Sequence, residues 1–338
     1  MALFEHLGYA YAHENSQATQ IQSVFPGFRG TPDGTRRITM TQLSVDGLVE
    51  NILLNLNDEL AQEFSGDVLF LKSGMMQPID DLLRIEVEAI NNGNKKGDSK
   101  DKLVVLLETT GGYIEVVERI VKIFRNHYQE VEFVVPNYAY SAGTVLVMSG
   151  DEIHMDYHSI LGPIDPQFET DGDAIVPGMG YLAKYEELVK TINDTGDVNG
   201  VKAELAYLVQ RFDPAKLYHI EQAIEHSIAL LKEWLPIYKF KDWTVTSRGM
   251  KVTKEMKEQR AHEIAEILGK SDRWHSHGRG ISLVELTDEE IKLKVENFGL
   301  KPKLSKKIRT YYSLLIDYMY KTSMNGAIHT QNGLRRTR

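Results

Sequence analysis

Short, mostly apolar runs alternate with longer segments that carry apolar residues at helical spacing over about 90 residues in the first half of this chain. The runs are strand-sized: residues 68–71, 103–107, 131–135 and 152–155. Residues 103–107 lack polar alternation, which is typical of a strand covered on both faces. The segments between them place apolar residues along one side of a helix: residues 78–91, 111–127 and 141–148. This alternation predicts an α/β fold with a largely parallel sheet.

Outside this region the pattern is mostly helical. Helical spacing of apolar residues predicts further helices: residues 46–60, 202–210, 214–235, 251–269 and 305–324. The last five residues, 334–338, are basic and are expected to be a frayed tail. We divide the chain into an N-terminal extension of unclear role, a catalytic core, a helical region that completes the fold, and a C-terminal amphipathic helix with its tail: residues 1–60, 61–198, 199–300 and 301–338.

Composition excludes several classes of protein. The formal net charge of -9 argues against a nucleic acid or an anionic membrane as the general partner. No cysteine is present among the 338 residues, so disulfides and thiolate chemistry are excluded. The N-terminus has neither a basic segment nor a long apolar one, and no apolar run is long enough to span a bilayer. We therefore expect a cytoplasmic protein that does not span the membrane.

Ser141 stands at the junction of a strand and a helix. The strand-like run 131–135 is stopped by Pro136, and Ser141, Ala142 and Gly143 lead into the apolar helix. This arrangement places one hydroxyl at a helix N-terminus, where unpaired N–H groups favour developing negative charge, and small residues leave room for an acyl group. The alternative is that Ser141 only caps the helix, which is a common role for serine.

A second strand-to-helix junction carries the sequence Glu108-Thr109-Thr110-Gly111-Gly112. Two glycines free the backbone to direct N–H groups at a ligand, so this turn is a candidate oxyanion hole, with the N–H of Ala142 as a second donor. A phosphate-binding turn is a weaker interpretation, because the P-loop lysine and the dinucleotide fingerprint are both absent. A plain tight turn is the third possibility.

The general base is the hardest residue to place from the residues alone. His154 and His158 follow Ser141 closely, but a histidine in such a place is more often a structural hydrogen bonder. Lys184 and Lys190 lie after a loop rich in glycine and proline, and a lysine acts as a base if burial lowers its pKa. The pair His275 and His277 could bind a metal, but no third ligand stands at a telling spacing, and we expect no metal site.

Four segments, in this order, resemble the Clp-protease/crotonase superfamily, and among its branches the serine dehydrogenase proteinases, which are related to signal peptide peptidase A. The first is a strand with its Gly-Gly turn at 106–112, the second is the serine segment at 134–144, and the third is a short acidic strand at 150–156. The fourth and most specific is Leu161-Gly162-Pro163-Ile164-Asp165-Pro166-Gln167. The resemblance extends over roughly residues 67–195. It implies a Clp-protease/crotonase-like fold of repeated β-β-α type units with a helical C-terminal extension.

The resemblance also implies a Ser–Lys peptidase. Ser141 would be the nucleophile, and Gly111, Gly112 and Ala142 would supply the oxyanion hole. Lys184 falls where the family carries its basic lysine, with Lys190 in reserve. The place of the histidine in the Clp proteolytic subunit holds Ile164-Asp165-Pro166 here, which disfavours a Ser-His-Asp triad. Thr110 departs from the family, which has proline before Gly-Gly.

The function expected from these features is hydrolysis of peptides or unfolded chains by a serine endopeptidase without a cofactor. Members of this fold usually form rings or stacked rings, so we expect a homo-oligomer, with a further partner protein possible. One alternative is a catalytically silent scaffold that binds a peptide or protein in the same groove. Another is an acyl-CoA enzyme of crotonase type, which would not require Ser141.

Overall fold

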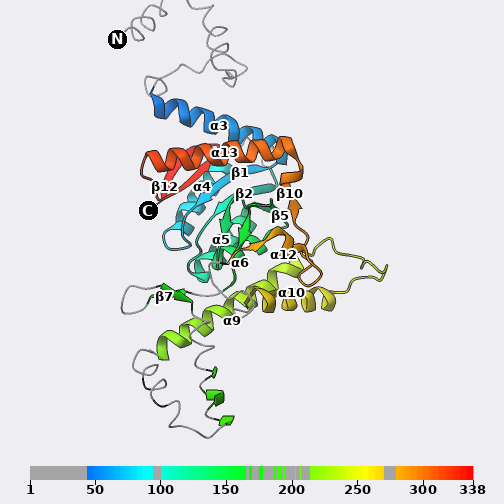
Figure 1. The fold of residues 1–338 in the computed structure, drawn as a ribbon. Coiled ribbons are helices and arrows are strands. Elements are labelled where there is room, and N and C mark those ends of the chain that lie inside the picture. Colours follow the sequence, from blue (N-terminus) through cyan, green and yellow to red (C-terminus); the bar gives the residue numbers. More distant parts are fainter. Residues whose placement is uncertain are drawn as a thin grey trace, which may run out of the picture.

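A seven-stranded sheet forms the centre of the protein, as the computed structural model shows (Figure 1). The structure describes residues 44–93, 100–164, 214–269 and 279–337, together with short stretches at 167–169, 175–177, 186–187, 189–191, 193–194, 202 and 206. The strand order is β10-β5-β3-β2-β1-β11-β12. In that order the strands are Glu296–Asn297, Glu152–Met155, Glu130–Val134, Lys102–Glu108, Asp67–Lys72, Gly326–Thr330 and Gly333–Thr337.

The strand directions bring the ends of the central strands together. Strand β2 pairs in parallel with β1 and with β3, and β3 pairs in parallel with β5. Strand β11 runs antiparallel to β1, and β12 runs antiparallel to β11. Because β1, β2, β3 and β5 share one direction, the segments that follow them leave the sheet at the same edge.

Helices cover both faces of the sheet, because the strand side chains alternate between two apolar clusters. Leu103, Val105 and Leu107 of β2 belong to the cluster with one helix group, and Val104 and Leu106 belong to the other. The first group comprises α4 (Ile79–Gly93), α5 (Ile114–His127), α6 (Ala142–Met148), α9 (Pro214–Ile237) and α10 (Lys254–Gly269). The second comprises α3 (Val45–Phe64) and α13 (Pro302–Lys321), which lie side by side in Figure 1.

Smaller elements complete the fold near the shared edge. A second sheet joins β4 to β6 in parallel and β6 to β9 antiparallel. The remaining short elements are the strands β4 (Tyr138–Ala139), β6 (Ile160–Leu161) and β9 (Ile281–Ser282), the hairpin of β7 (Gln167–Glu169) and β8 (Ile175–Pro177), the helix α12 (Leu283–Thr287), and the 3-10 helix η3 (Phe298–Leu300).

The predicted α/β class is confirmed, and each expected strand and helix within the described ranges is present. The bounds of several helices differ by three or four residues, and one difference bears on the site: α5 begins at Ile114 rather than Gly111, because Gly111 and Gly112 adopt positive φ angles that a helix does not allow. The helix expected at 202–210 lies almost wholly outside the described residues. The boundaries proposed at 60, 198 and 300 stay predictions.

The expectation of a frayed C-terminal tail is wrong. Gly333–Thr337 forms β12, which pairs along its whole length with β11. The two-residue turn Gln331-Asn332 connects the strands, and Gly333, at φ 113, is the first residue of β12 and pairs with Thr330. The basic side chains misled the prediction: Arg335 forms an ion pair with Glu86 at 2.6 Å, and Arg336 donates to the carbonyl of Thr322. In the part of the chain that the structure describes, no helix is long and apolar enough to cross a bilayer.

Candidate active site

Ser141 adopts a backbone conformation that non-glycine residues rarely take. Its φ is 53° and its ψ is -123°, and the N–H of Gly143 donates to the carbonyl of Tyr140 at 2.8 Å. These values describe the first central position of a type II′ turn, which glycine usually occupies. A serine held there carries backbone strain, and such strain concentrates at functional sites. The same device presents the nucleophile on a sharp strand-to-helix turn in α/β hydrolases.

The hydroxyl of Ser141 is not used to build the fold. Ser141 occupies the N-cap position of α6, but its side chain accepts no capping hydrogen bond. Among the described residues its hydroxyl has no hydrogen-bond partner, whereas Ser44 and Ser282 cap their helices with theirs. The interpretation of Ser141 as a simple cap is therefore wrong, and its hydroxyl is left available for other chemistry.

The turn that contains Gly111 and Gly112, the glycine turn, packs directly against Ser141. Gly111 has a φ of 91°, and a Cβ added there would lie 2.6 Å from the carbonyl oxygen of Tyr140 and 2.9 Å from the Cβ of Ser141. Gly112 has a φ of 148°, and a Cβ there would lie 2.5 Å from the carbonyl oxygen of Met75. Only glycine combines this backbone freedom with so close an approach.

Backbone hydrogen bonds hold the two turns together. Thr109 N–H donates to Tyr138 at 3.2 Å, and Tyr140 N–H donates back to Thr109 at 3.0 Å. On the other side, Met75 N–H donates to Gly111 and Tyr113 N–H donates to Met75, both at 2.8 Å. The glycine turn is thus fixed between the end of β1 and the segment that carries Ser141.

Two of the three predicted oxyanion donors have a free N–H. The N–H of Gly111 donates to the side-chain oxygen of Thr109 at 3.0 Å, so it is already used. The N–H groups of Gly112 and Ala142 donate to no residue that the structure describes. Ala142 is the first residue of α6, where the helix leaves its N–H groups unpaired.

A third segment contacts the Ser141 turn through a buried hydroxyl. Thr144 is fully buried, and its hydroxyl contacts the carbonyl oxygens of Ala139 and Gly162 at 2.9 and 2.8 Å. A Cβ on Gly162 would lie 2.4 Å from the ring of Tyr140. The start of the Leu-Gly-Pro-Ile motif therefore lies against the serine turn, while Asp165 and Pro166 are outside the described residues.

Some of the candidate bases and metal ligands lie outside the described residues, and others are exposed. Lys184, His275 and His277 lie outside the described residues. Lys190 and His158 are exposed. Metal binding has no support in the described part of the chain, which contains no group of three or more histidine, aspartate or glutamate side chains placed to hold an ion.

His154 is turned away from Ser141. Its Nε2 lies 2.9 Å from the carboxylate of Glu132, and its ring contacts Phe64 of α3 edge-on at 5.3 Å. Its strand neighbours Ile153 and Met155 point to the face that α6 covers, so His154 points to the opposite face. His154 is a structural hydrogen bonder, as its position in the sequence had suggested.

Lys239 is a buried lysine that the sequence did not single out. The side chain of Lys239 is 1% exposed, and burial lowers its pKa although Glu152 holds its amine at 2.9 Å. Its other contact is the carbonyl of Asp151. Both residues lie at the start of β5, whereas Ser141 lies beyond the opposite ends of the parallel strands, so Lys239 does not serve this site. No motif marked it, because its burial arises from the packing of the segment after α9.

A buried acidic group lies beside the glycine turn. Glu108, the last residue of β2, is 1% exposed and forms an ion pair with Lys72 at 2.5 Å. Burial and the nearby charge of Glu108 raise the pKa of Tyr138 to about 12. The ring of Tyr138 stacks on Tyr140 at 5.1 Å. Sequence reasoning missed the role of Glu108, because only the fold brings its partners together from three separate segments.

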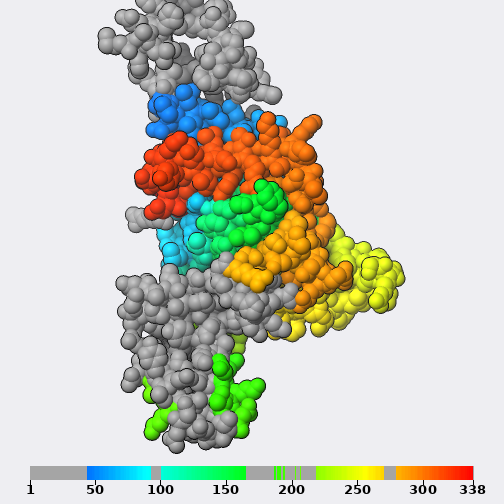
Figure 2. Space-filling model, viewed as in Figure 1, coloured from blue at the N-terminus to red at the C-terminus, as the bar shows by residue number. Residues whose placement is uncertain are grey.

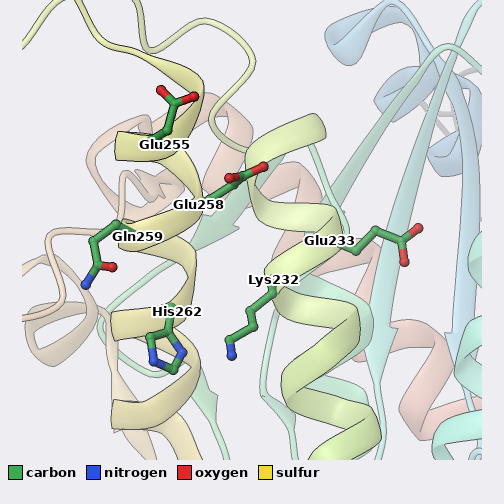
Figure 3. Close-up of a pocket in the computed structure, with 6 residues that line it drawn as sticks. All are labelled: Lys232, Glu233, Glu255, Glu258, Gln259 and His262. Atoms are coloured by element: carbon green, nitrogen blue, oxygen red, sulfur yellow. The ribbon is translucent and has the colours of Figure 1, made fainter.

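A pocket of about 520 Å³ lies elsewhere, between α9 and α10 (Figure 3). In the close-up, Lys232 and His262 extend toward the space between the two helices, whereas Glu233 points away from it. None of the lining residues belongs to the Ser141 turn or the glycine turn, so the pocket is separate from the candidate active site. The lining comprises Lys232, Glu233, Glu255, Glu258, Gln259 and His262.

Comparison with solved structures finds several proteases. Two mutants of the 1510-N membrane-bound stomatin-specific protease, one of them in complex with a substrate peptide, have TM-scores of 0.39 and 0.38 and sequence identities of 13% and 14%. The two matches cover 71% and 68% of this chain and 84% and 75% of the protease chains. The ClpP protease catalytic domain from Plasmodium falciparum has a TM-score of 0.26 and 14% identity, over 32% of this chain and 58% of its own.

Comparison with curated proteins finds two relatives in Methanocaldococcus jannaschii. The uncharacterized protein MJ0137 is 39% identical over 69 residues, which are 20% of this chain and 24% of the relative. The uncharacterized protein MJ1495 is 33% identical over 63 residues, which are 19% of this chain and 22% of the relative. The matches thus span about a quarter of the length of these relatives.

A family model described as ClpP-like SDH-type serine proteinase matches residues 78–190. The matched region begins before α4 and contains the glycine turn, the Ser141 turn and the Leu-Gly-Pro-Ile motif. This agrees with the resemblance carried by the four sequence segments. The family match therefore covers residues 78–190 of this chain and confirms there the resemblance to ClpP-like SDH-type serine proteinases.

Proposed function

We propose that this protein is a serine peptidase in which Ser141 is the nucleophile. The observation that carries the proposal is the strained turn of Ser141, whose hydroxyl has no structural hydrogen bond among the described residues. This turn packs against Gly111, and the N–H groups of Gly112 and Ala142 donate to no described residue. The family match over residues 78–190 supports the same reading. A silent scaffold would have no need to hold a serine in a strained conformation.

The proposed reaction begins with attack of the Ser141 hydroxyl oxygen on the carbonyl carbon of a peptide bond. The N–H groups of Gly112 and Ala142 stabilise the oxyanion that forms, because they are fixed before the charge develops. When the intermediate collapses, the C–N bond breaks and the amine leaves with the proton taken from Ser141. Water then hydrolyses the acyl-enzyme and restores the hydroxyl.

Lys184 is our candidate for the general base that moves this proton. The support is its place in the family pattern, after the Leu-Gly-Pro-Ile segment. Lys190 is the weaker candidate, because it is exposed and a lysine base depends on burial to be neutral near pH 7. Activity that is lost in Lys184→Ala but retained in Lys190→Ala would support this choice, and the reverse result would overturn it.

We further propose that the protein works as a cytoplasmic homo-oligomer on peptides or unfolded chains. A chain without cysteine suits a reducing compartment. Large apolar side chains are exposed on one side of α3, at Val45, Leu48 and Ile52, and could contribute to an assembly surface. Light scattering tests this part, and a monomer at micromolar concentration would contradict it.

The direct test of the peptidase is labelling with a fluorophosphonate, which reacts with activated serine hydroxyls. We expect wild-type protein to be labelled and Ser141→Ala not to be labelled, with both proteins unfolding at the same temperature. Ser149→Ala is a matched control, since Ser149 is buried at the other end of α6. Absence of labelling in the folded wild type, together with binding of a peptide, would instead support the scaffold.

A further inference from the structure

The helix α13, which lies outside the region of the family match, contacts strand ends that lead into the site. It spans Pro302–Lys321, whereas the matched region ends at residue 190. In the space-filling view the orange-to-red C-terminal part of the protein borders the cyan-to-green middle of the chain (Figure 2). Two side chains of α13, Arg309 and Tyr312, reach across this border. They are three residues apart and therefore lie on the same side of the helix.

Tyr312 binds the residue that leads into the glycine turn. Its hydroxyl donates a hydrogen bond to the carboxylate of Glu108, which is followed directly by Thr109. The same carboxylate oxygen accepts from the side-chain amide of Asn137 at 3.1 Å, and Asn137 precedes Ser141 by one short strand, β4. Its other oxygen pairs with Lys72 at the end of β1, three residues before Met75. Glu108 thus joins three segments that build the site.

Arg309 binds the two other strand ends. One of its guanidinium nitrogens donates to the carbonyl of Pro136, just after β3, and another pairs with the carboxylate of Asp156, just after β5. Asp156 is 2% exposed and accepts from the N–H groups of His158 and Ser159, which shapes the turn into β6. Arginine suits this task because its planar fork fixes the direction of each hydrogen bond.

These contacts have consequences for catalysis because the site is assembled from the same strand ends. The free N–H groups of Gly112 and Ala142 come from two segments, one after β2 and the other after β3 and β4. Their stabilising effect depends on both pointing at one atom, and small misplacements of catalytic groups cost large factors in rate. A group that fixes the spacing of these segments therefore acts on the reaction without touching the substrate.

We propose that α13 is a positioning element of the active site: Tyr312, through Glu108, and Arg309, through Pro136 and Asp156, hold the glycine turn and the Ser141 turn in register. This inference rests on the proposed peptidase function for its effect on rate. The C-terminal part of the chain is then part of the catalytic apparatus.

The test compares Tyr312→Phe with wild type and with the control Tyr320→Phe. Tyr320 is on the same helix and is 85% exposed. Two readouts are measured below the unfolding transition of every variant: the rate of fluorophosphonate labelling at Ser141, and amide hydrogen exchange of residues 108–113 and 137–143. We expect Tyr312→Phe to slow labelling about tenfold or more and to speed exchange in both segments, and Tyr320→Phe to change neither.

A double variant sharpens the test. Glu108→Gln removes the carboxylate charge that Tyr312, Asn137 and Lys72 bind, so adding Tyr312→Phe to Glu108→Gln should slow labelling little further than Glu108→Gln alone. If Tyr312→Phe does not fold, Arg309→Lys replaces it. This variant keeps the positive charge but loses the planar guanidinium group, and it should also slow labelling and speed exchange in both segments.

The outcomes separate this inference from the proposed function. A lower unfolding temperature in Tyr312→Phe with unchanged labelling and unchanged exchange of the two segments means a merely structural role and overturns the inference. If wild type is never labelled, the peptidase proposal fails, and the exchange measurement still decides whether α13 orders the two turns.

Discussion

Gly111 gives the sharpest test of how the active site is built. A Cβ at this position would lie 2.6 Å from the carbonyl oxygen of Tyr140, where ordinary contacts begin at 3.4 Å. In Gly111→Ala the glycine turn and the Ser141 turn must therefore move apart by about 0.8 Å, a displacement of the size that costs about 100-fold in rate. Alanine at a φ of 91° adds a conformational cost of about 1–2 kcal/mol, and the overlap adds about 1–3 kcal/mol.

Gly249 provides the matched control. Its φ is 77°, and an added Cβ would meet nothing within 4 Å. Gly249→Ala therefore carries the conformational cost alone, about 1–2 kcal/mol, and should leave the site intact. Urea unfolding measures the difference between the two variants, and fluorophosphonate labelling measures the effect on Ser141.

We expect Gly111→Ala to be the less stable variant by about 1–3 kcal/mol and to label about 100-fold more slowly than wild type, while Gly249→Ala labels normally. Equal stability of the two variants together with normal labelling of Gly111→Ala would refute the packing of the glycine turn against Ser141.

Two further predictions concern stability. Burial lowers the pKa of His329 to about 4, so the unfolded chain takes up the proton first as the pH falls below 6.5, and stability is lost between pH 6.5 and 4. Between pH 7.5 and 5, we expect urea unfolding to show a loss of about 2 kcal/mol in the free energy of unfolding of wild type, and a smaller loss in His329→Gln. Equal losses in the two proteins would contradict the assignment of this loss to His329. Truncation after Asn332 removes β12 and leaves the buried Glu86 without Arg335, so the urea midpoint should fall; a frayed tail predicts no change.

The core of the fold could be predicted because its signals are local. A few consecutive residues suffice to predict each element: the apolar runs predict β2 and β3, and the periodic apolar residues predict α5. The C-terminal hairpin was missed although Asn332 and Gly333 are residues that favour turns, because Arg335 and Arg336 resemble a solvated tail. Only the tertiary contacts of these arginines, with Glu86 and with the end of α13, show that they belong to a sheet.

The candidate site could be predicted in its chain segments but not in its detail. The small residues around Ser141 and the pair Gly111-Gly112 indicated two junctions that face one another. The strained backbone conformation of Ser141 and the hydrogen bond from the Gly111 N–H to the Thr109 side chain could not be predicted from residue spacing. The role of Glu108 depends on contacts with residues up to 204 positions away in the chain.

Peptide mapping of the fluorophosphonate adduct tests the central claim most directly. The folded wild-type protein is labelled, digested and analysed by mass spectrometry, beside a sample unfolded in urea before labelling. We predict one phosphonyl group per chain, on the peptide that contains Ser141, and none in the unfolded sample. A label on a different serine, or equal labelling of folded and unfolded protein, would contradict the claim that the turn at Ser141 makes this hydroxyl reactive.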